Sequence, residues 1–200
     1  FTVSQEKQFT AMLTTVSEMG FTPMYVHLAQ TAGSTKMNLP ATNAIRLGIG
    51  LYGINPLERR DKAYSTLTNL KPVLELRSTI IKVQELKKGD RVSYNGIFTA
   101  PKPMKIGVLP LGYYEGYPRE LSNTGIVTYK NYELPVVGRV CMNHTMISLE
   151  NSDAQVGSQV TLISQNNSLP NSVLLLCETH NLFNYSLLTG INQNIRRIVD

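Results

Sequence analysis

The segment RVSYNGIFTA, residues 91–100, contains a tyrosine that could take part in acid–base chemistry. Tyr94 stands between a serine and an Asn-Gly pair, just after an alternating apolar run. A phenol there could exchange a proton with a substrate if the chain holds it away from a strand. Tyrosine is also a favoured strand residue and Asn-Gly a common turn, so residue statistics alone favour a structural role.

Two segments near the start could together bind an anion such as a phosphate. HLAQTAGST has hydroxyls at Thr31, Ser34 and Thr35, and RLGIG has glycines at 48 and 50. If both follow neighbouring parallel strands, hydroxyls and backbone amides reach one ligand, as in the phosphate sites of α/β barrels. Small polar residues also simply form loops. GIGLYG matches a dinucleotide motif only formally, because Asn-Pro follows where a helix would have to continue.

Two further segments contain side chains that could contact a ligand. Arg46 lies inside the apolar segment NAIRLGIG, where a charge is costly unless it is paired or hydrogen-bonded. A ligand and a structural salt bridge explain it equally well. LPLGYYEGYPRE places three tyrosines, including Tyr113, beside Glu115 and Arg119. Such a loop fits the lining of a pocket or interface, or an exposed turn.

Composition limits the classes of protein to which the chain can belong. Its 200 residues are 42% apolar, enough to bury a core, and no run approaches the roughly 18 residues of a membrane span. The net charge is +5, but the basic residues are scattered, which argues against nucleic-acid binding. Three histidines and two cysteines share no metal-ligand spacing. We therefore expect a metal-free, cytoplasmic protein with reduced thiols and no signal peptide.

The elements that must position these residues fall into two parts. Apolar residues spaced about 3.6 apart predict a helix that begins after Ser4 and ends at Gly20. The apolar runs 21–29 and 44–53 predict buried parallel strands, so residues 1–60 read as the end of a β/α repeat. Regular short strands and turns predict a separate all-β domain over 67–200, closed by a helix from Ser172 to Gly190. The polar stretch 55–69 is the expected boundary.

Six segments, taken together, resemble the latter part of the alanine racemases, fold-type III enzymes that depend on pyridoxal phosphate (PLP). In order they are MYVHLAQTAGS, AIRLGIGLYG, GDRVSYNGIF, LPLGYYEGYPRELSN, VVGRVCMN and NYSLLT. The resemblance covers nearly the whole chain. It implies that residues 1–60 are the last strands of a TIM-type (β/α)8 barrel with the phosphate-binding part, followed by the C-terminal β domain.

The resemblance also implies where the cofactor binds. The residues that it assigns to the PLP phosphate are Thr31, Gly48, Ile49 and Tyr185. Thr31 keeps the hydroxyl of the serine usual in the family, whereas Gln30 replaces an asparagine. Arg46 would face the pyridine nitrogen. Because a guanidinium keeps its proton, it disfavours a protonated pyridine nitrogen.

By the same resemblance, Tyr94 is one of two catalytic bases and acts at the active site of the opposite subunit in a homodimer. The second base is the lysine that bonds to PLP. Tyr113 and Arg119 would line the substrate entrance, and Met142 would contact substrate through its backbone. Asn143 replaces an aspartate that is usual in the family, which removes a charge near the entrance.

The resemblance implies interconversion of L-alanine and D-alanine for peptidoglycan, without nucleic acid or membrane partners. The motif that carries the PLP lysine, similar to VKANAYGH, does not occur in these 200 residues. We therefore expect a fragment that is inactive alone. Two alternatives stay open: a non-catalytic β-domain module for binding or dimerisation, and a racemase for another small amino acid such as serine.

Overall fold

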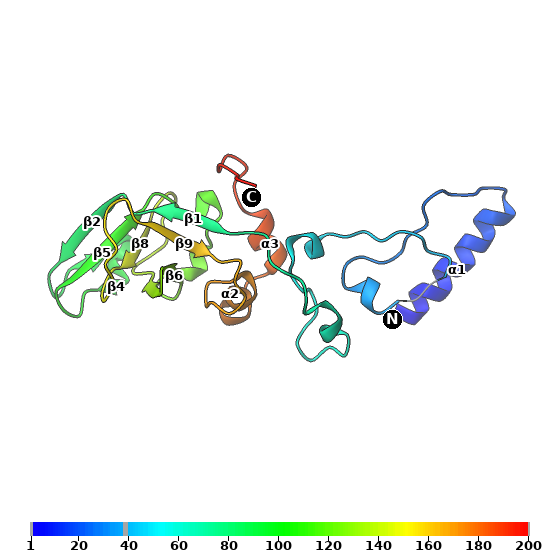
Figure 1. Cartoon of the computed structure of the whole chain (residues 1–200), viewed down its shortest axis with the longest axis horizontal. Helices are drawn as coiled ribbons and strands as arrows, with labels where there is room; N and C mark the ends of the chain where they lie inside the picture. The colour runs from blue at the N-terminus through cyan, green and yellow to red at the C-terminus, as the bar shows by residue number, and fades with distance from the viewer. Residues whose placement is uncertain (1, 38–39, 200) are drawn as a thin grey trace. The chain divides into compact units, whose positions relative to one another are not determined.

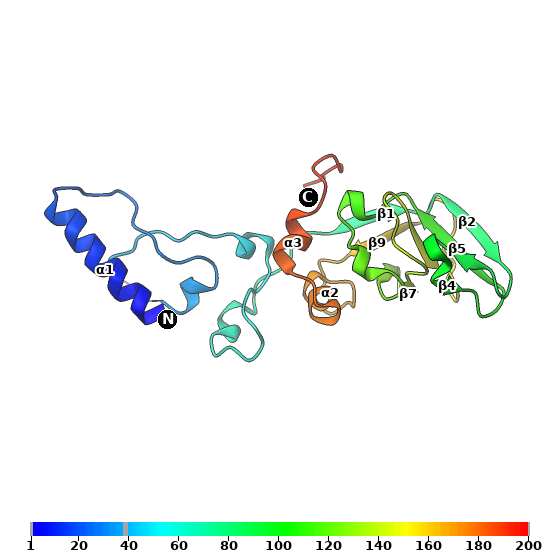
Figure 2. The same cartoon turned by 180° about the vertical axis from the view of Figure 1, so that it is seen from behind.

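The computed structural model describes residues 2–37 and 40–199 of the chain. Its contacts divide the chain into an N-terminal unit, Phe1–Val73, and a C-terminal unit, Leu74–Asp200. Figure 1 shows the helix and loops of the first unit and the strands of the second, and Figure 2 shows the same elements from behind.

The N-terminal unit contains helix α1, Thr2–Glu18, which the apolar period predicts; the predicted start after Ser4 is wrong, because Ser4 already lies inside the helix. Gly20 follows with a left-handed φ of 83°, a conformation that glycine adopts without steric cost. After it, the described residues of this unit form three short 3-10 helices: Gly33–Thr35, Ile49–Tyr52 and Tyr64–Leu67. Within α1, all of which the structure describes, no residue is buried.

The two parallel strands predicted over 21–29 and 44–53 do not form. Among the described residues, these segments meet at one parallel bridge, Gln30 with Arg46, beside a hydrogen bond from Arg46 N to Ala29 O (2.9 Å). The direction of pairing is the predicted one. A strand needs a continuous ladder of hydrogen bonds with its neighbours, and one bridge does not supply it. Apolar side chains such as Phe21 and Met24 are therefore exposed.

The C-terminal unit contains the short strands that its alternating sequence predicts. Its described strands form three antiparallel sheets. The first has the order β1-β9-β6-β7: Leu76–Thr79, Gln159–Ile163, Ile126–Tyr129 and Tyr132–Pro135. The second has the order β2-β5-β8: Lys82–Leu86, Met104–Leu109 and Thr145–Ser148. The third pairs β3, Arg91–Val92, with β4, Phe98–Thr99.

A buried apolar cluster fixes the β3–β4 hairpin to the second sheet. Val92 packs with Leu86, Met104 and Ile106, and Phe98 lies partly buried against the same cluster. Both ends of the loop that contains Tyr94 are therefore held by burial of apolar surface, which contributes on the order of 1.5–3 kcal/mol per large side chain. The core positions the loop although the loop itself is not buried.

The predicted closing helix is two helices, α2 at Val173–His180 and α3 at Asn184–Thr189. Asn181 ends α2 in a left-handed conformation, with φ 51°. Asparagine tolerates that conformation and so can terminate a helix inside an apolar pattern. None of the helices in the described part is long and apolar enough to cross a membrane. Over the same residues, no three His, Cys, Asp or Glu side chains gather as a metal site.

Candidate functional site

The two anion-binding segments of the N-terminal unit meet at Thr31. Its Oγ1 accepts hydrogen bonds from Gly48 N and Gly50 N, both at 3.3 Å, and the residue is almost fully buried. A Cβ at Gly50 would lie 2.8 Å from Thr31 Cγ2, so glycine permits the approach. Ile49, between the two glycines, is buried in the 3-10 helix. The predicted grouping of hydroxyl and amides is therefore present in the structure.

The other hydroxyls of this loop bind the loop itself. Ser34 Oγ donates to Thr31 O and Thr35 Oγ1 to Ala32 O, each at 2.8 Å. Gln30 Oε1 accepts from Ala32 N at 2.7 Å, so the glutamine also closes the turn. These side chains shape the loop and leave Thr31 as its buried hydroxyl.

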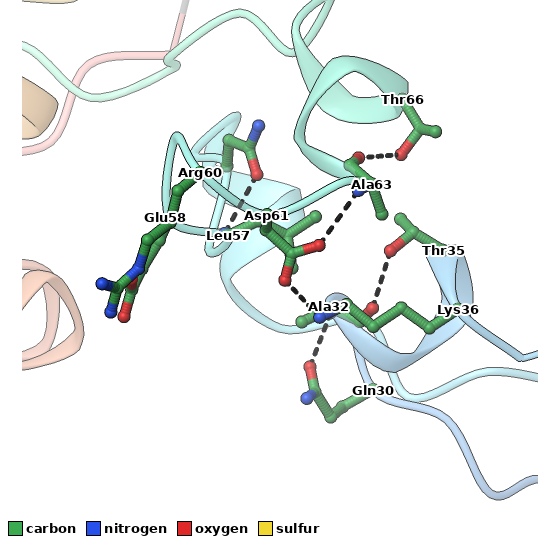
Figure 3. A network of polar contacts seen from close by, with 11 residues as sticks. Gln30, Ala32, Thr35, Lys36, Leu57, Glu58, Arg60, Asp61, Ala63 and Thr66 are labelled. Atoms are coloured by element: carbon green, nitrogen blue, oxygen red, sulfur yellow. Dashed lines mark hydrogen bonds and ion pairs between the residues drawn. The ribbon is translucent and has the colours of Figure 1, made fainter. Parts of the chain in front are cut away.

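An ion pair fixes the outer side of the same loop (Figure 3). Lys36 Nζ bonds the Asp61 carboxylate, whose Oδ1 accepts from Ala63 N at 3.0 Å. The hydrogen bond from Lys36 is the largest cause that lowers the pKa of Asp61 below its ordinary value, and the Ala63 amide adds to it. Sequence analysis missed this pair, because 25 residues separate its members.

Arg46 lies beside the Thr31 loop and bonds a histidine. Its Nη1 lies 2.6 Å from His27 Nδ1, and its Nη2 donates to Leu28 O at 3.0 Å. Because a guanidinium only donates, His27 Nδ1 accepts and its ring proton is on Nε2. The Arg46 side chain is thus oriented by an imidazole and a backbone carbonyl. Neither is the carboxylate that a structural salt bridge would need. His27 was not predicted as a partner of Arg46. Its position in the apolar segment 21–29, which was expected to lie beside the segment of Arg46, could have indicated this contact.

Tyr94 lies outside both strands of its hairpin, in the tight loop between β3 and β4, and 69% of it is exposed. The preceding Ser93 has φ 65° and ψ −175°, a region that is essentially restricted to glycine. Asn95 and Gly96 also have positive φ. Arg91 holds this backbone by donating to Asn95 O (2.8 Å) and Gly96 O (3.2 Å). A strained loop thus presents the phenol to solvent.

The segment 139–143 connects the Tyr94 loop to the tyrosine-rich loop. Ser93 Oγ donates to Arg139 O at 2.8 Å and lies 3.3 Å from Cys141 Sγ. On the other side, Tyr113 N donates to Cys141 O at 3.0 Å. Tyr113 and Met142 are each about half exposed. Three sequence-predicted residues, Tyr94, Tyr113 and Met142, are therefore carried by loops that share one backbone segment.

The tyrosine-rich loop also borders a cleft of about 590 Å³. Its lining includes Tyr113, Arg119, His180 and Phe183. Arg119 is exposed there. Tyr185, in α3, stacks on Phe183 with ring centroids 5.2 Å apart. Tyr117, which also borders the cleft, is fully buried, and desolvation raises the pKa of its phenol far above the ordinary value.

The predicted site residues are thus grouped within each unit. The N-terminal unit contains Thr31, Arg46, Gly48 and Ile49, and the C-terminal unit contains Tyr94, Tyr113, Arg119, Met142 and Tyr185. Supporting residues that sequence reasoning missed, such as Ser93, act through side-chain contacts to groups far away along the chain. Nothing in their local sequence marks such contacts.

Comparison with known proteins gives concordant matches over both units. The model of the alanine racemase N-terminal domain matches residues 1–56, and that of the C-terminal domain matches residues 73–199. Alanine racemase from Staphylococcus carnosus is 37% identical over 89% of this chain and 46% of its own length. The alanine racemase of Geobacter sulfurreducens is 34% identical over 97% and 50%, respectively.

Solved structures agree. Alanine racemase from Bacillus anthracis with bound L-Ala-P superposes with a TM-score of 0.80 and 29% identity, covering 94% of this chain and 48% of that one. The Clostridium difficile 630 alanine racemase, in complex with cycloserine, gives 0.83 and 26% over 97% and 50%. The chain spans about half the length of the relatives it matches. With both of its units matched, the chain belongs to the alanine racemase family.

Proposed function

We propose that this chain is the C-terminal half of a PLP-dependent alanine racemase that interconverts L-alanine and D-alanine. Residues 1–60 would form the end of the (β/α)8 barrel and 67–200 the C-terminal β domain. The observation that carries the proposal is the strained loop that exposes Tyr94 and is joined through residues 139–143 to Tyr113 and Met142. Catalysis is a property of the complete homodimeric protein, which would supply cytoplasmic D-alanine for peptidoglycan.

The residues of the N-terminal unit fit the PLP phosphate. Thr31 Oγ1 and the amides of Gly48 and Gly50 already converge, and a side chain at Gly50 would close the space. Thr31, Gly48 and Ile49 would hold the phosphate through a hydroxyl and backbone amides, which are groups that donate to phosphate oxygens. Arg46, oriented by His27 and Leu28, would donate to the pyridine nitrogen and thereby disfavour protonation of that nitrogen.

The exchange of a proton at the α-carbon is assigned to Tyr94. When bound, PLP stabilises negative charge at the α-carbon of the substrate. As a phenolate, Tyr94 would take the α-proton of L-alanine and become a neutral phenol, and a protonated group on the opposite face of the α-carbon would donate its own proton to give D-alanine. Its exposure permits the phenol to serve the active site of a second subunit. The fixed loop lowers the cost of orienting it, since positioning is a large part of general-base catalysis.

The substitution Tyr94→Phe in the complete racemase tests this role. It removes the hydroxyl and keeps the ring, so we expect kcat with L-alanine to fall by roughly 10²–10⁴-fold. PLP content, measured by absorbance, should stay at the parental value. Tyr132→Phe, on a partly exposed tyrosine of β7, is the matched control. Parental rates in both directions would exclude Tyr94 as a base.

Asn143 supports a second candidate, racemisation of another small amino acid. It follows Met142 directly and bonds the loop that carries Tyr113. An amide can both donate to and accept from a polar substrate side chain, whereas the aspartate usual in the family accepts only. Racemisation rates with L-alanine and L-serine at equal concentrations decide between them: a higher kcat/KM for serine would replace alanine as the substrate.

A further inference from the structure

The carboxylate of Glu115 lies between the two loops that carry Tyr113 and Met142. Its Oε2 accepts a hydrogen bond from Gly112 N at 2.8 Å, and its Oε1 accepts one from Asn143 Nδ2 at 2.8 Å. Both contacts are partly buried. Hydrogen bonds to an ionised acceptor are stronger than those between neutral groups. One side chain therefore ties the start of the first loop to the second.

The backbones of these loops are also in direct contact. Tyr113 N donates to Cys141 O and Tyr114 N donates to Met142 O, at 3.0 and 2.9 Å. A Cβ at Gly112 would lie 2.1 Å from Cys141 O. The loops therefore pack too closely for a side chain at that position. A displacement of either loop changes the place of Tyr113 relative to the backbone of Met142.

A third segment reaches the same loop from the end of α3. Asn192 N donates to Glu115 O at 3.2 Å, and Asn192 Nδ2 donates to Tyr114 O at 3.1 Å. Gly116, with φ 98°, approaches so closely that a Cβ there would lie 2.4 Å from Gly190 O. Gly190 caps the helix that carries Tyr185. The loop that contains Glu115 carries Tyr113 itself. It also contacts the segment that carries Met142 and the end of the helix that carries Tyr185.

We propose that Glu115 is a positioning residue that, through Asn143, sets the separation between Tyr113 and the Met142 backbone and thereby the binding of substrate. This inference rests on the proposed function, in which those two residues contact the substrate. The pairing depends on chemistry at both ends: the ionised carboxylate only accepts, and the Asn143 amide can donate. The substitution N143D would place a second acceptor of like charge against Glu115.

A double-mutant cycle in the complete racemase tests the pair, with the parent, N143D, E115Q and the double variant E115Q/N143D. N143D should raise KM for alanine roughly tenfold and change kcat less, because it disturbs substrate binding more than proton transfer. E115Q should raise KM less than N143D does, roughly threefold, because the uncharged amide keeps an acceptor for Gly112 N but loses the stronger hydrogen bonds of the carboxylate. The double variant should recover to about twofold of the parent, because the introduced amide then donates to the introduced carboxylate.

The control for loss of a negative charge is Glu133→Gln, on an exposed residue of β7. Equal KM effects of N143D in the parental and E115Q backgrounds would overturn the proposal, and so would an unchanged KM in N143D.

If the parent racemises no alanine, the proposed function fails, and urea unfolding of the same four proteins decides the inference. A lower midpoint for N143D that E115Q restores supports the pair; additive midpoints reject it.

Discussion

At the scale of single residues, Cys177 shows how burial controls reactivity. Burial in α2, with a smaller contribution from the Glu178 charge, raises the pKa of its thiol from 9.0 to about 11. Because the thiolate is the nucleophile, alkylation at pH 8 should be roughly a hundredfold slower than for an unperturbed cysteine, and should rise about tenfold per pH unit up to pH 10. Peptide mapping after iodoacetamide treatment measures this rate.

Cys177→Ala removes the labelled peptide and identifies its signal. Because the pKa of Cys177 is raised, its thiol stays protonated in the folded protein at neutral and moderately alkaline pH, until the pH nears 11. A rate that becomes constant near pH 9 would contradict the assignment.

At the scale of elements, the start of α2 depends on one hydroxyl. Ser172 Oγ accepts from Leu175 N at 3.3 Å, and the side chain is fully buried. Ser172→Ala leaves that amide without its acceptor where water cannot replace it, so we expect the free energy of unfolding to fall by about 1 kcal/mol. Urea unfolding followed by circular dichroism gives this value.

Ser168→Ala, at an exposed serine just upstream of α2, is the matched control and should change stability by less than about 0.5 kcal/mol. Equal losses for both variants would show that the cap does not stabilise α2. A helix that begins at Ser172 was predicted from sequence, because a serine before an apolar run is a local signal. The break at Asn181 was not predicted, because asparagine is compatible with both helix and left-handed turn.

At the scale of the whole molecule, apolar burial is unequal between the two units. Among the described residues of the N-terminal unit, the buried apolar side chains are Ile49, Ile54 and Leu57. The buried clusters of the sheets and α2 lie in the C-terminal unit. Because apolar burial is the main favourable term in folding, residues 74–199 should fold alone with a cooperative urea transition. Residues 2–73 alone should show no cooperative transition.

Circular dichroism and amide NMR dispersion of the two separate segments make the comparison. The full 200-residue chain is the reference for the midpoint of the C-terminal unit. A gradual, non-cooperative loss of signal from residues 74–199 would show that their sheets need the N-terminal unit.

The sequence by itself determined the features that depend on neighbouring residues. Alternation and turn residues specify the short antiparallel strands, the period near 3.6 specifies α1, and the ordered motifs specify the family. The meeting of Thr31 with the glycines at 48 and 50 was also predictable, since consecutive apolar segments tend to lie side by side. The prediction of two parallel strands was wrong, because a strand forms only where neighbouring strands supply a continuous ladder of hydrogen bonds.

Only the tertiary structure decided how the remaining side chains are held. Ser93 adopts a glycine-like conformation because Arg139 O and the packed hairpin fix it, and local sequence does not encode that strain. Glu115 and Asn143 meet across 28 residues because two loops pack backbone to backbone. Contacts of this kind depend on the whole packing of the C-terminal unit, so the residue types reveal the candidate chemistry and the fold decides which of them meet.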